Sequence, residues 1–309
     1  MLSGKPERWC HDIKVTDING KVYNGRIAKA SADPAEVVAG CDIVLLCLPG
    51  FIIASTLERI KPFVGEAVVG SIVSSTGFFF EAHRILGTGA RLFGFQRTPF
   101  IARVEQYGSS AHLLGYKPKV YVAVENVSAR EQFRLLVQRL WLTPTQLLDN
   151  FYQAALTNSN PILHTGRLYT MFCGRENEVF DHNILFYKEW TDEASQMLID
   201  MDAEFFTLLH HLGVGGIPTL LDYYESHDAA SLTKKISGIT AFQTILSPMK
   251  EVNGGWIVDF GSRYFTEDFP YGLAFIKRLC DAHSLAAPHI DRVMAWGMAQ
   301  ISDHKAEQR

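Results

Sequence analysis

The chain has 309 residues, of which 47% are apolar and 20% are charged, and its formal net charge is −4. This length and composition are typical of a globular chain that can bury a core, and they favour two domains. The mild acidity, with no run of Lys and Arg longer than a pair, argues against a nucleic acid as partner.

The apolar runs and the cysteines exclude two further classes of protein. The longest apolar runs, such as residues 42–48, are strand-sized and fall short of the ~20 residues of a membrane-spanning helix, so no membrane partner is expected. The five cysteines have no paired spacing, which indicates reduced thiols and predicts neither a disulfide framework nor a metal site. No signal peptide is recognisable at the amino end, so we expect the cytoplasm.

The first half of the chain alternates between strand-like and helix-like segments, which is typical of an α/β domain. Residues 13–23 predict an early hairpin with an Asn19-Gly20 turn. Residues 42–48 form an unbroken apolar run that ends at Pro49-Gly50, and this run predicts a central strand buried on both faces.

Further along, strands and helices continue to alternate. The pattern predicts a helix over 52–60, a strand over 67–73, a turn at Ser74 to Gly77, a helix over 78–86, and strands over 91–95 and 119–124.

Beyond about Asp149 the apolar residues recur at helical spacing, first over 190–212 and then over 228–236, 271–283 and 289–302. We therefore predict a Rossmann-like parallel-sheet domain over residues 1–149, followed by a mostly α-helical domain over residues 150–309.

In a sheet of this kind ligands bind beyond the carboxyl ends of the strands, so the loops after Leu48, Val73 and Phe95 are candidate sites. The loop Pro49-Gly50-Phe51 either lines a nicotinamide or substrate pocket or is an ordinary strand-ending turn. The glycine-rich turn that opens a Rossmann domain is not found, because Gly87-Thr-Gly89 lacks the third glycine and precedes a strand.

Two segments of the second half carry candidate catalytic groups. Residues 158–167 place His164 among small and polar residues, and residues 261–273 place Arg263 five residues before Asp268. Such an arginine can bind a carboxylate, and such an acid can orient an imidazole. The alternatives are an ordinary core histidine and a run of residues 266–268 that caps the helix after Pro270.

These two segments, Asn-Pro-Ile-Leu-His-Thr-Gly at 160–166 and Arg-Tyr-Phe-Thr-Glu-Asp-Phe-Pro-Tyr-Gly-Leu at 263–273, resemble the catalytic stretches of the octopine/nopaline (opine) dehydrogenase family. The chain is also similar to the wider group with a 6-phosphogluconate-dehydrogenase-like C-terminal domain. The resemblance implies an NAD(P)-dependent reductive condensation, in which an amino acid and a 2-keto acid such as pyruvate form an imine that takes a hydride.

The resemblance also implies roles for individual residues. His164 matches the family's catalytic histidine, and Asp268 matches the partner that fixes its tautomer. The expected substrate contacts are Arg263 as a carboxylate clamp, Asn160 as an amide contact, and Gln96 and Arg97 in the loop over 96–103. Leu48, Pro49 and Gly50 are expected beside the cofactor, which is NAD or NADP.

The departure from the family lies at the amino end, where about 30 residues of the strand–turn–helix unit and its following strand are not found. We therefore expect an incomplete cofactor domain. Two alternatives stay open: a reductase of a single keto or hydroxy acid, of the ketopantoate reductase type, and a non-catalytic truncated binding protein. The sequence leaves open NAD or NADP, the two substrates, the product stereochemistry and the oligomeric state, a homodimer included.

Overall fold

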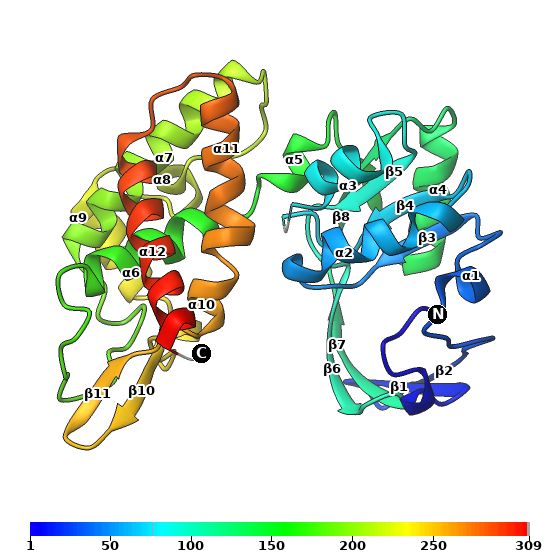
Figure 1. The fold of residues 1–309 in the computed structure, drawn as a ribbon, viewed down its shortest axis with the longest axis horizontal. Coiled ribbons are helices and arrows are strands. Elements are labelled where there is room, and N and C mark those ends of the chain that lie inside the picture. Colours follow the sequence, from blue (N-terminus) through cyan, green and yellow to red (C-terminus); the bar gives the residue numbers. More distant parts are fainter. Residues whose placement is uncertain (76, 308–309) are drawn as a thin grey trace. The chain divides into compact units, whose positions relative to one another are not determined.

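The computed structural model describes residues 1–75 and 77–307, and the chain divides into two compact units, Met1–Thr157 and Asn158–Arg309 (Figure 1). The division lies a short way beyond residue 149, where the sequence suggests a domain boundary. Across the described residues, no helix is both long enough and apolar enough to cross a membrane.

A five-stranded sheet forms the centre of the first unit, in the order β3-β4-β5-β8-β9. Its strands are β3 (Ile43–Leu46), β4 (Val68–Ser71), β5 (Leu92–Phe95), β8 (Val120–Glu125) and β9 (Thr145–Leu147). The first three strands are parallel, β8 is antiparallel to β5, and β9 is parallel to β8. The sheet confirms the expected α/β class.

The expectation of a central position for residues 42–48 is wrong. Within the described residues β3 is hydrogen-bonded to β4 alone and forms the edge of the sheet. Its first three residues are only partly buried, whereas all four residues of β4 are buried. The apolar run predicts a strand correctly, but strand order depends on pairing with distant segments.

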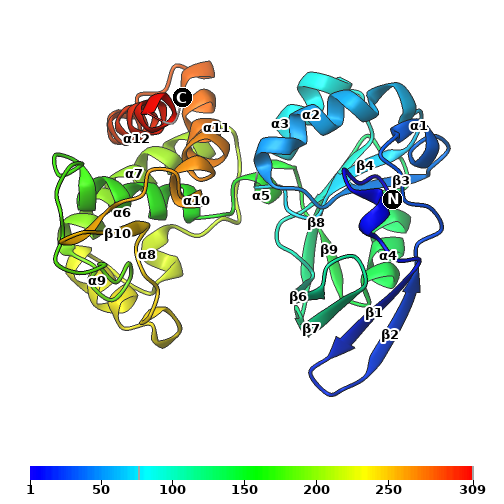
Figure 2. The same ribbon diagram turned by 60° about the horizontal axis from the view of Figure 1, so that its bottom comes forward.

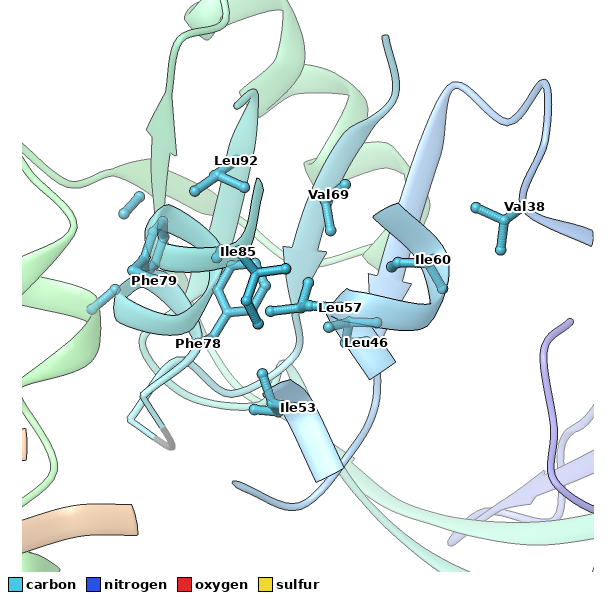
Figure 3. Close-up of a cluster of buried hydrophobic side chains, with 13 residues drawn as sticks. Val38, Leu46, Ile53, Leu57, Ile60, Val69, Phe78, Phe79, Ile85 and Leu92 are labelled. Carbon is cyan, nitrogen blue, oxygen red and sulfur yellow. The ribbon is translucent and has the colours of Figure 1, made fainter. Parts of the chain in front are cut away.

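Helices cover both faces of this sheet. Helices α2 (Gly50–Ile60) and α3 (Phe78–Leu86) pack on one face, and α4 (Arg130–Trp141) packs on the other. Figure 3 shows the first interface, where Ile53, Leu57 and Ile60 of α2 lie in one cluster with strand residues such as Val69. The spacing of the three α2 residues places them on one side of the helix.

A second, four-stranded sheet in the same unit has the order β2-β1-β7-β6 (Figure 2). It joins the hairpin of β1 (Asp12–Asp17) and β2 (Val22–Arg26) to the hairpin of β6 (Phe100–Gln106) and β7 (Ser110–Tyr116). The predicted early hairpin is confirmed, and Gly20 adopts a φ of 80° in its turn. The second hairpin was not predicted: residues 100–103, expected in a loop, lie in β6.

The second unit is mostly helical, as predicted. Its longer helices are α6 (Asn160–Phe172), α7 (Asp192–His211), α9 (Ala229–Ser237), α11 (Ala274–Ala282) and α12 (Pro288–Glu307). A hairpin of β10 (Met249–Val252) and β11 (Gly255–Val258) lies between α9 and α11 in the chain. Before α11 the chain forms the short α10 (Arg263–Thr266) and the π-helical turn η4 (Phe269–Leu273).

Candidate active site

His164 lies in the buried interior of the second unit, on α6. Pro161 occupies the first turn of this helix, where proline fits because that N–H has no helical partner. The apolar residues Ile162, Leu163 and Leu168 bury the helix against its neighbours, and His164 is only 8% exposed. A histidine in such a position needs partners for its two ring nitrogens.

Asp268 provides the first of these partners. Its carboxylate accepts a hydrogen bond from Nδ1 of His164 at 2.8 Å, although the two residues are 104 positions apart. The side chain makes no capping bond to η4, so the pairing with His164 replaces the capping role that the sequence also allowed. An ionised carboxylate can only accept, so it fixes the hydrogen of the neutral ring on Nδ1.

Gly272 permits this pairing. A Cβ atom at this position would lie 2.9 Å from Cγ of Pro161 and 3.1 Å from its Cβ, too close for the rigid proline ring to avoid. Glycine therefore lets η4 approach the first turn of α6, which brings Asp268 within reach of His164.

Tyr187 provides the second partner, which the sequence did not predict. Its hydroxyl lies 3.0 Å from Nε2 of His164, and the tyrosine is 8% exposed. Burial, aided by the nearby Tyr264, Tyr224 and Asp268, raises the pKa of Tyr187 well above its usual range, so the phenol keeps its hydrogen. Nothing in its spacing distinguishes Tyr187 from the other ten of the eleven tyrosines.

Arg167 is a further buried polar residue that the sequence did not single out as functional. It lies one helical turn after His164 and is 3% exposed. Its Nε donates to the carbonyl of Phe186 at 3.3 Å, its Nη2 donates to that of Glu189 at 2.6 Å, and its guanidinium lies 5.2 Å from the Trp190 ring. Burial lowers the pKa of Arg167 to about 10, which leaves it charged at neutral pH.

The expected substrate contacts of the second unit lie at its surface. The side chain of Arg263 is 82% exposed, and it donates to both carboxylate oxygens of Glu267, from Nε at 3.0 Å and from Nη2 at 2.8 Å. Asn160 is exposed at the start of α6, where its backbone N–H donates to Oδ1 of Asn158 at 3.2 Å. No hydrogen bond within the described residues joins either side chain to His164.

In the first unit, the expected contacts follow β5. The amide of Gln96 donates to the carbonyl of Gln153 at 3.1 Å and to Oγ1 of Thr157 at 3.0 Å, so this side chain is tied to the last residues of the unit. Arg97 is exposed. The structure thus fixes Gln96 and leaves Arg97 at the surface.

The expected cofactor residues Leu48, Pro49 and Gly50 follow β3 directly. Helix α2 begins at Gly50 after Pro49 without a side-chain cap, and α3 begins after Gly77, also without one. Two uncapped helix amino ends beyond neighbouring parallel strands fit the polar groups of a dinucleotide. The turn Gly-x-Gly-x-x-Gly does not occur in the 309 residues, so the features of this chain that fit the cofactor are these two helix ends.

Residues 147–301, which include the whole His164 cluster, match the family described as NAD/NADP octopine/nopaline dehydrogenase, alpha-helical domain. The chain belongs to the octopine/nopaline dehydrogenase family. This membership confirms the predicted enzyme class, an NAD- or NADP-dependent oxidoreductase that acts on CH–NH donors.

The similarity of the chain to individual relatives supports this family assignment. The chain is 25% identical to the opine dehydrogenase of Haliotis discus hannai over 334 aligned residues, which cover 97% of the chain and 82% of the relative. It is 23% identical to the tauropine dehydrogenase of Arabella iricolor, with coverage of 96% and 82%.

Solved structures confirm the fold. Octopine dehydrogenase with NADH and L-arginine has a TM-score of 0.83 at 22% identity, with coverage of 96% of this chain and 81% of that one. Yersinopine dehydrogenase with NADP+ has a TM-score of 0.74 at 14% identity, with coverage of 96% and 82%. A ketopantoate reductase reaches 0.60 at 15% identity with coverage of 95% and 86%, which shows that the alternative enzyme class shares the fold.

Proposed function

We propose that this protein catalyses the reductive condensation of an amino acid with a 2-keto acid such as pyruvate. The observation that carries the proposal is the 2.8 Å hydrogen bond between the buried His164 and Asp268, within the domain that matches the family. A histidine with its tautomer fixed by a carboxylate is suited to general acid–base work.

In this reaction His164 moves the protons. Because Nδ1 donates to Asp268, the lone pair of the neutral ring lies on Nε2. When the amino acid binds, its ammonium group replaces the Tyr187 hydroxyl at Nε2 and gives up a proton to that nitrogen. The free amine then attacks the keto carbon. The imidazolium returns a proton to the departing hydroxyl, and water leaves as the imine forms. The nicotinamide, when bound, supplies the hydride that reduces the imine to a secondary amine.

The other assigned residues bind the substrates and the cofactor. Glu267 holds Nε and Nη2 of Arg263 and orients a guanidinium that can also take a substrate carboxylate. We assign further substrate contacts to Asn160, Gln96 and Arg97, and cofactor contacts to Leu48, Pro49 and Gly50. In this proposal residues 1–149 hold the cofactor, and residues 150–309 supply His164, Asp268 and Arg263.

The test is the oxidation of NADH and NADPH by the purified protein with pyruvate and a panel of amino acids. Arginine belongs in the panel because an octopine dehydrogenase structure contains it. We expect turnover only when both substrates are present, and we expect His164→Gln to lower it by about 10²–10⁴-fold. His182→Gln is the matched control, since the side chain of His182 is 57% exposed.

The result would contradict the proposal if folded protein turned over no pair of substrates, or if His164→Gln matched the wild type. Turnover with the keto acid alone would indicate a simple keto acid reductase instead. The absence of any shift in the melting temperature with NADH or NADPH would indicate a binding protein without cofactor.

A further inference from the structure

Outside the His164 cluster, two exposed histidines of the second unit face each other. Nε2 of His211 lies 3.1 Å from Nδ1 of His283, although the two residues are 72 positions apart in the chain. Their ring centroids are 4.8 Å apart, with an angle of 60° between the ring planes. Each ring therefore directs one of its two nitrogens at the other ring.

The backbone fixes the place of both histidines, because each lies where a helix ends. His211 is the last residue of α7, and the N–H of Val214 donates back to the carbonyl of Leu209 at 2.9 Å. His283 directly follows α11, and its N–H donates to the carbonyl of Leu279 at 3.1 Å. Bonds of this kind are regular stops of a helix. Since α7 and α11 also contact each other (Figure 1), ordered backbone presents the two rings to the same point.

The separation of the two nitrogens fits two ligands of one metal ion. Imidazole nitrogens bind Zn²⁺ at about 2.0–2.1 Å, so two of them lie about 2.9 Å apart at a right angle and about 3.3 Å apart at the tetrahedral angle. The 3.1 Å between His211 and His283 falls between these values. Both histidines are exposed, so small rotations of the rings can aim both lone pairs at one ion.

The surroundings of the two rings also favour a cation. The carboxyl end of an α-helix carries partial negative charge on its unpaired carbonyls, and both histidines lie at such an end. A neutral imidazole carries one hydrogen. When an ion binds, the hydrogen between the rings moves through water to the outer nitrogen of its own ring, and both facing nitrogens are then free to bind the ion.

We propose that His211 and His283 form a binding site for one divalent transition metal ion, such as Cu²⁺, Ni²⁺ or Zn²⁺, which all accept imidazole ligands. The described residues hold no cluster of three or more His, Cys, Asp or Glu side chains that could bind a metal ion, so water completes the coordination. The site uses none of the five cysteines, whose spacing predicts no metal site. The bound ion joins the end of α7 to the end of α11.

The experiment is calorimetry of Ni²⁺ binding to the whole chain, without substrate or cofactor. We expect a Ni²⁺ site that His211→Gln and His283→Gln, each alone, weaken by about 10–100-fold or more, because even the loss of a group that supports a ligand costs that much. Mg²⁺ is the control ion and should not bind there, since it prefers oxygen ligands. His210→Gln is the control variant, because His210 is exposed on the same helix and its ring lies beside Phe206.

Thermal unfolding gives a second, independent measurement. The two ligands come from segments 72 positions apart and meet only in the folded chain, so Ni²⁺ binds the folded state more tightly than the unfolded state. Ni²⁺ should therefore raise the melting temperature of the wild type and of His210→Gln. It should leave the melting temperatures of His211→Gln and His283→Gln in place.

Three results would overturn the inference. The first is a wild-type chain that binds no Ni²⁺, and the second is binding that stays unchanged in His211→Gln or in His283→Gln. The third is an equal loss of binding in His210→Gln, which would indicate scattered surface histidines and no paired site. None of these measurements requires turnover, so a failure of this site is distinct from a failure of the proposed function.

Discussion

The two units hold their functional side chains in different ways. In the second unit, His164 bonds to Tyr187 and Asp268, and the buried Arg167 ties the segment of Tyr187 to α6. In the first unit, the expected ligand contacts lie in loops after strands, where Gln96 is tied down by hydrogen bonds and Arg97 is exposed.

This difference agrees with what proton transfer and ligand binding each require. Proton transfer needs groups fixed to within fractions of an ångström, and a buried network provides that order. Ligand binding can use loops on a rigid sheet, which adjust when the ligand arrives. Substitutions in the buried network should therefore change the rate of the chemical step, and substitutions in exposed positions should change binding.

The largest effect is expected for Asp268→Asn. The asparagine amide can donate to the histidine and so favour the wrong tautomer, and we expect turnover to fall by about 10²–10⁴-fold with little change in the melting temperature. The control is Asp281→Asn, whose side chain is 59% exposed and pairs with Lys277. Turnover of Asp268→Asn close to the wild type would mean that the buried network does not determine the rate.

A pair of glycine substitutions compares the two units directly. A methyl group at Gly272 meets Pro161 at 2.9 Å, and one at Gly70 of β4 meets Phe93 at 2.2 Å. Each change should lower the free energy of unfolding by about 1–3 kcal/mol. Only Gly272→Ala should also slow turnover of the folded enzyme, by about ten- to a hundredfold, because it separates Asp268 from His164.

Gly89→Ala is the control for both, since no atom lies within 4 Å of the added carbon. Unfolding by denaturant, followed by kinetics on the folded fraction, separates the two effects. Equal losses of turnover in Gly70→Ala and Gly272→Ala would remove the distinction between the units.

Arg263→Gln tests an exposed residue of the second unit. If Arg263 holds a substrate carboxylate, KM for the keto acid should rise by about tenfold or more, while the free energy of unfolding changes by less than about 0.5 kcal/mol. Arg175→Gln is the matched control, because Arg175 makes a similar exposed pair with both oxygens of Glu178. An unchanged KM in Arg263→Gln would limit the role of Arg263 to its pair with Glu267.

The smallest effect concerns a buried acid outside the site. Burial raises the pKa of Asp202 from 3.8 to about 6, and its carboxylate accepts from the N–H of Leu220 at 2.8 Å. The folded state therefore holds the proton more tightly than the unfolded state, and the free energy of unfolding should fall as the pH rises from about 4 to about 6. Above pH 6 this contribution is lost.

Asp202→Asn keeps an acceptor for Leu220 and removes the buried charge. At pH 7 the variant should be more stable than the wild type by about 1–2 kcal/mol, and its stability should not fall across that window. Asp303→Asn, at an exposed position of α12, is the control. A wild-type stability that is flat between pH 4 and 6 would contradict this expectation.

Much of the local structure could be predicted from the sequence. The bounds of α3 agree with the expectation, and the hairpin around Gly20 and the long helix α7 were expected from turn chemistry and periodicity. The segments that carry His164 and Asp268 were also recognised, from their resemblance to the family. Features of this kind depend on residues close together in the chain.

The tertiary structure alone decided the rest. The edge position of β3 and the pairing of β7 with β1 depend on which distant strands meet. The contact between His164 and Tyr187 depends on Arg167 and on the fold of residues 185–190, and no local spacing encodes it. The sequence by itself therefore determined several of the helices and strands and, through its resemblance to the family, the candidate dyad. Packing between distant segments decided what surrounds the histidine, because burial and hydrogen bonding are set by long-range contacts.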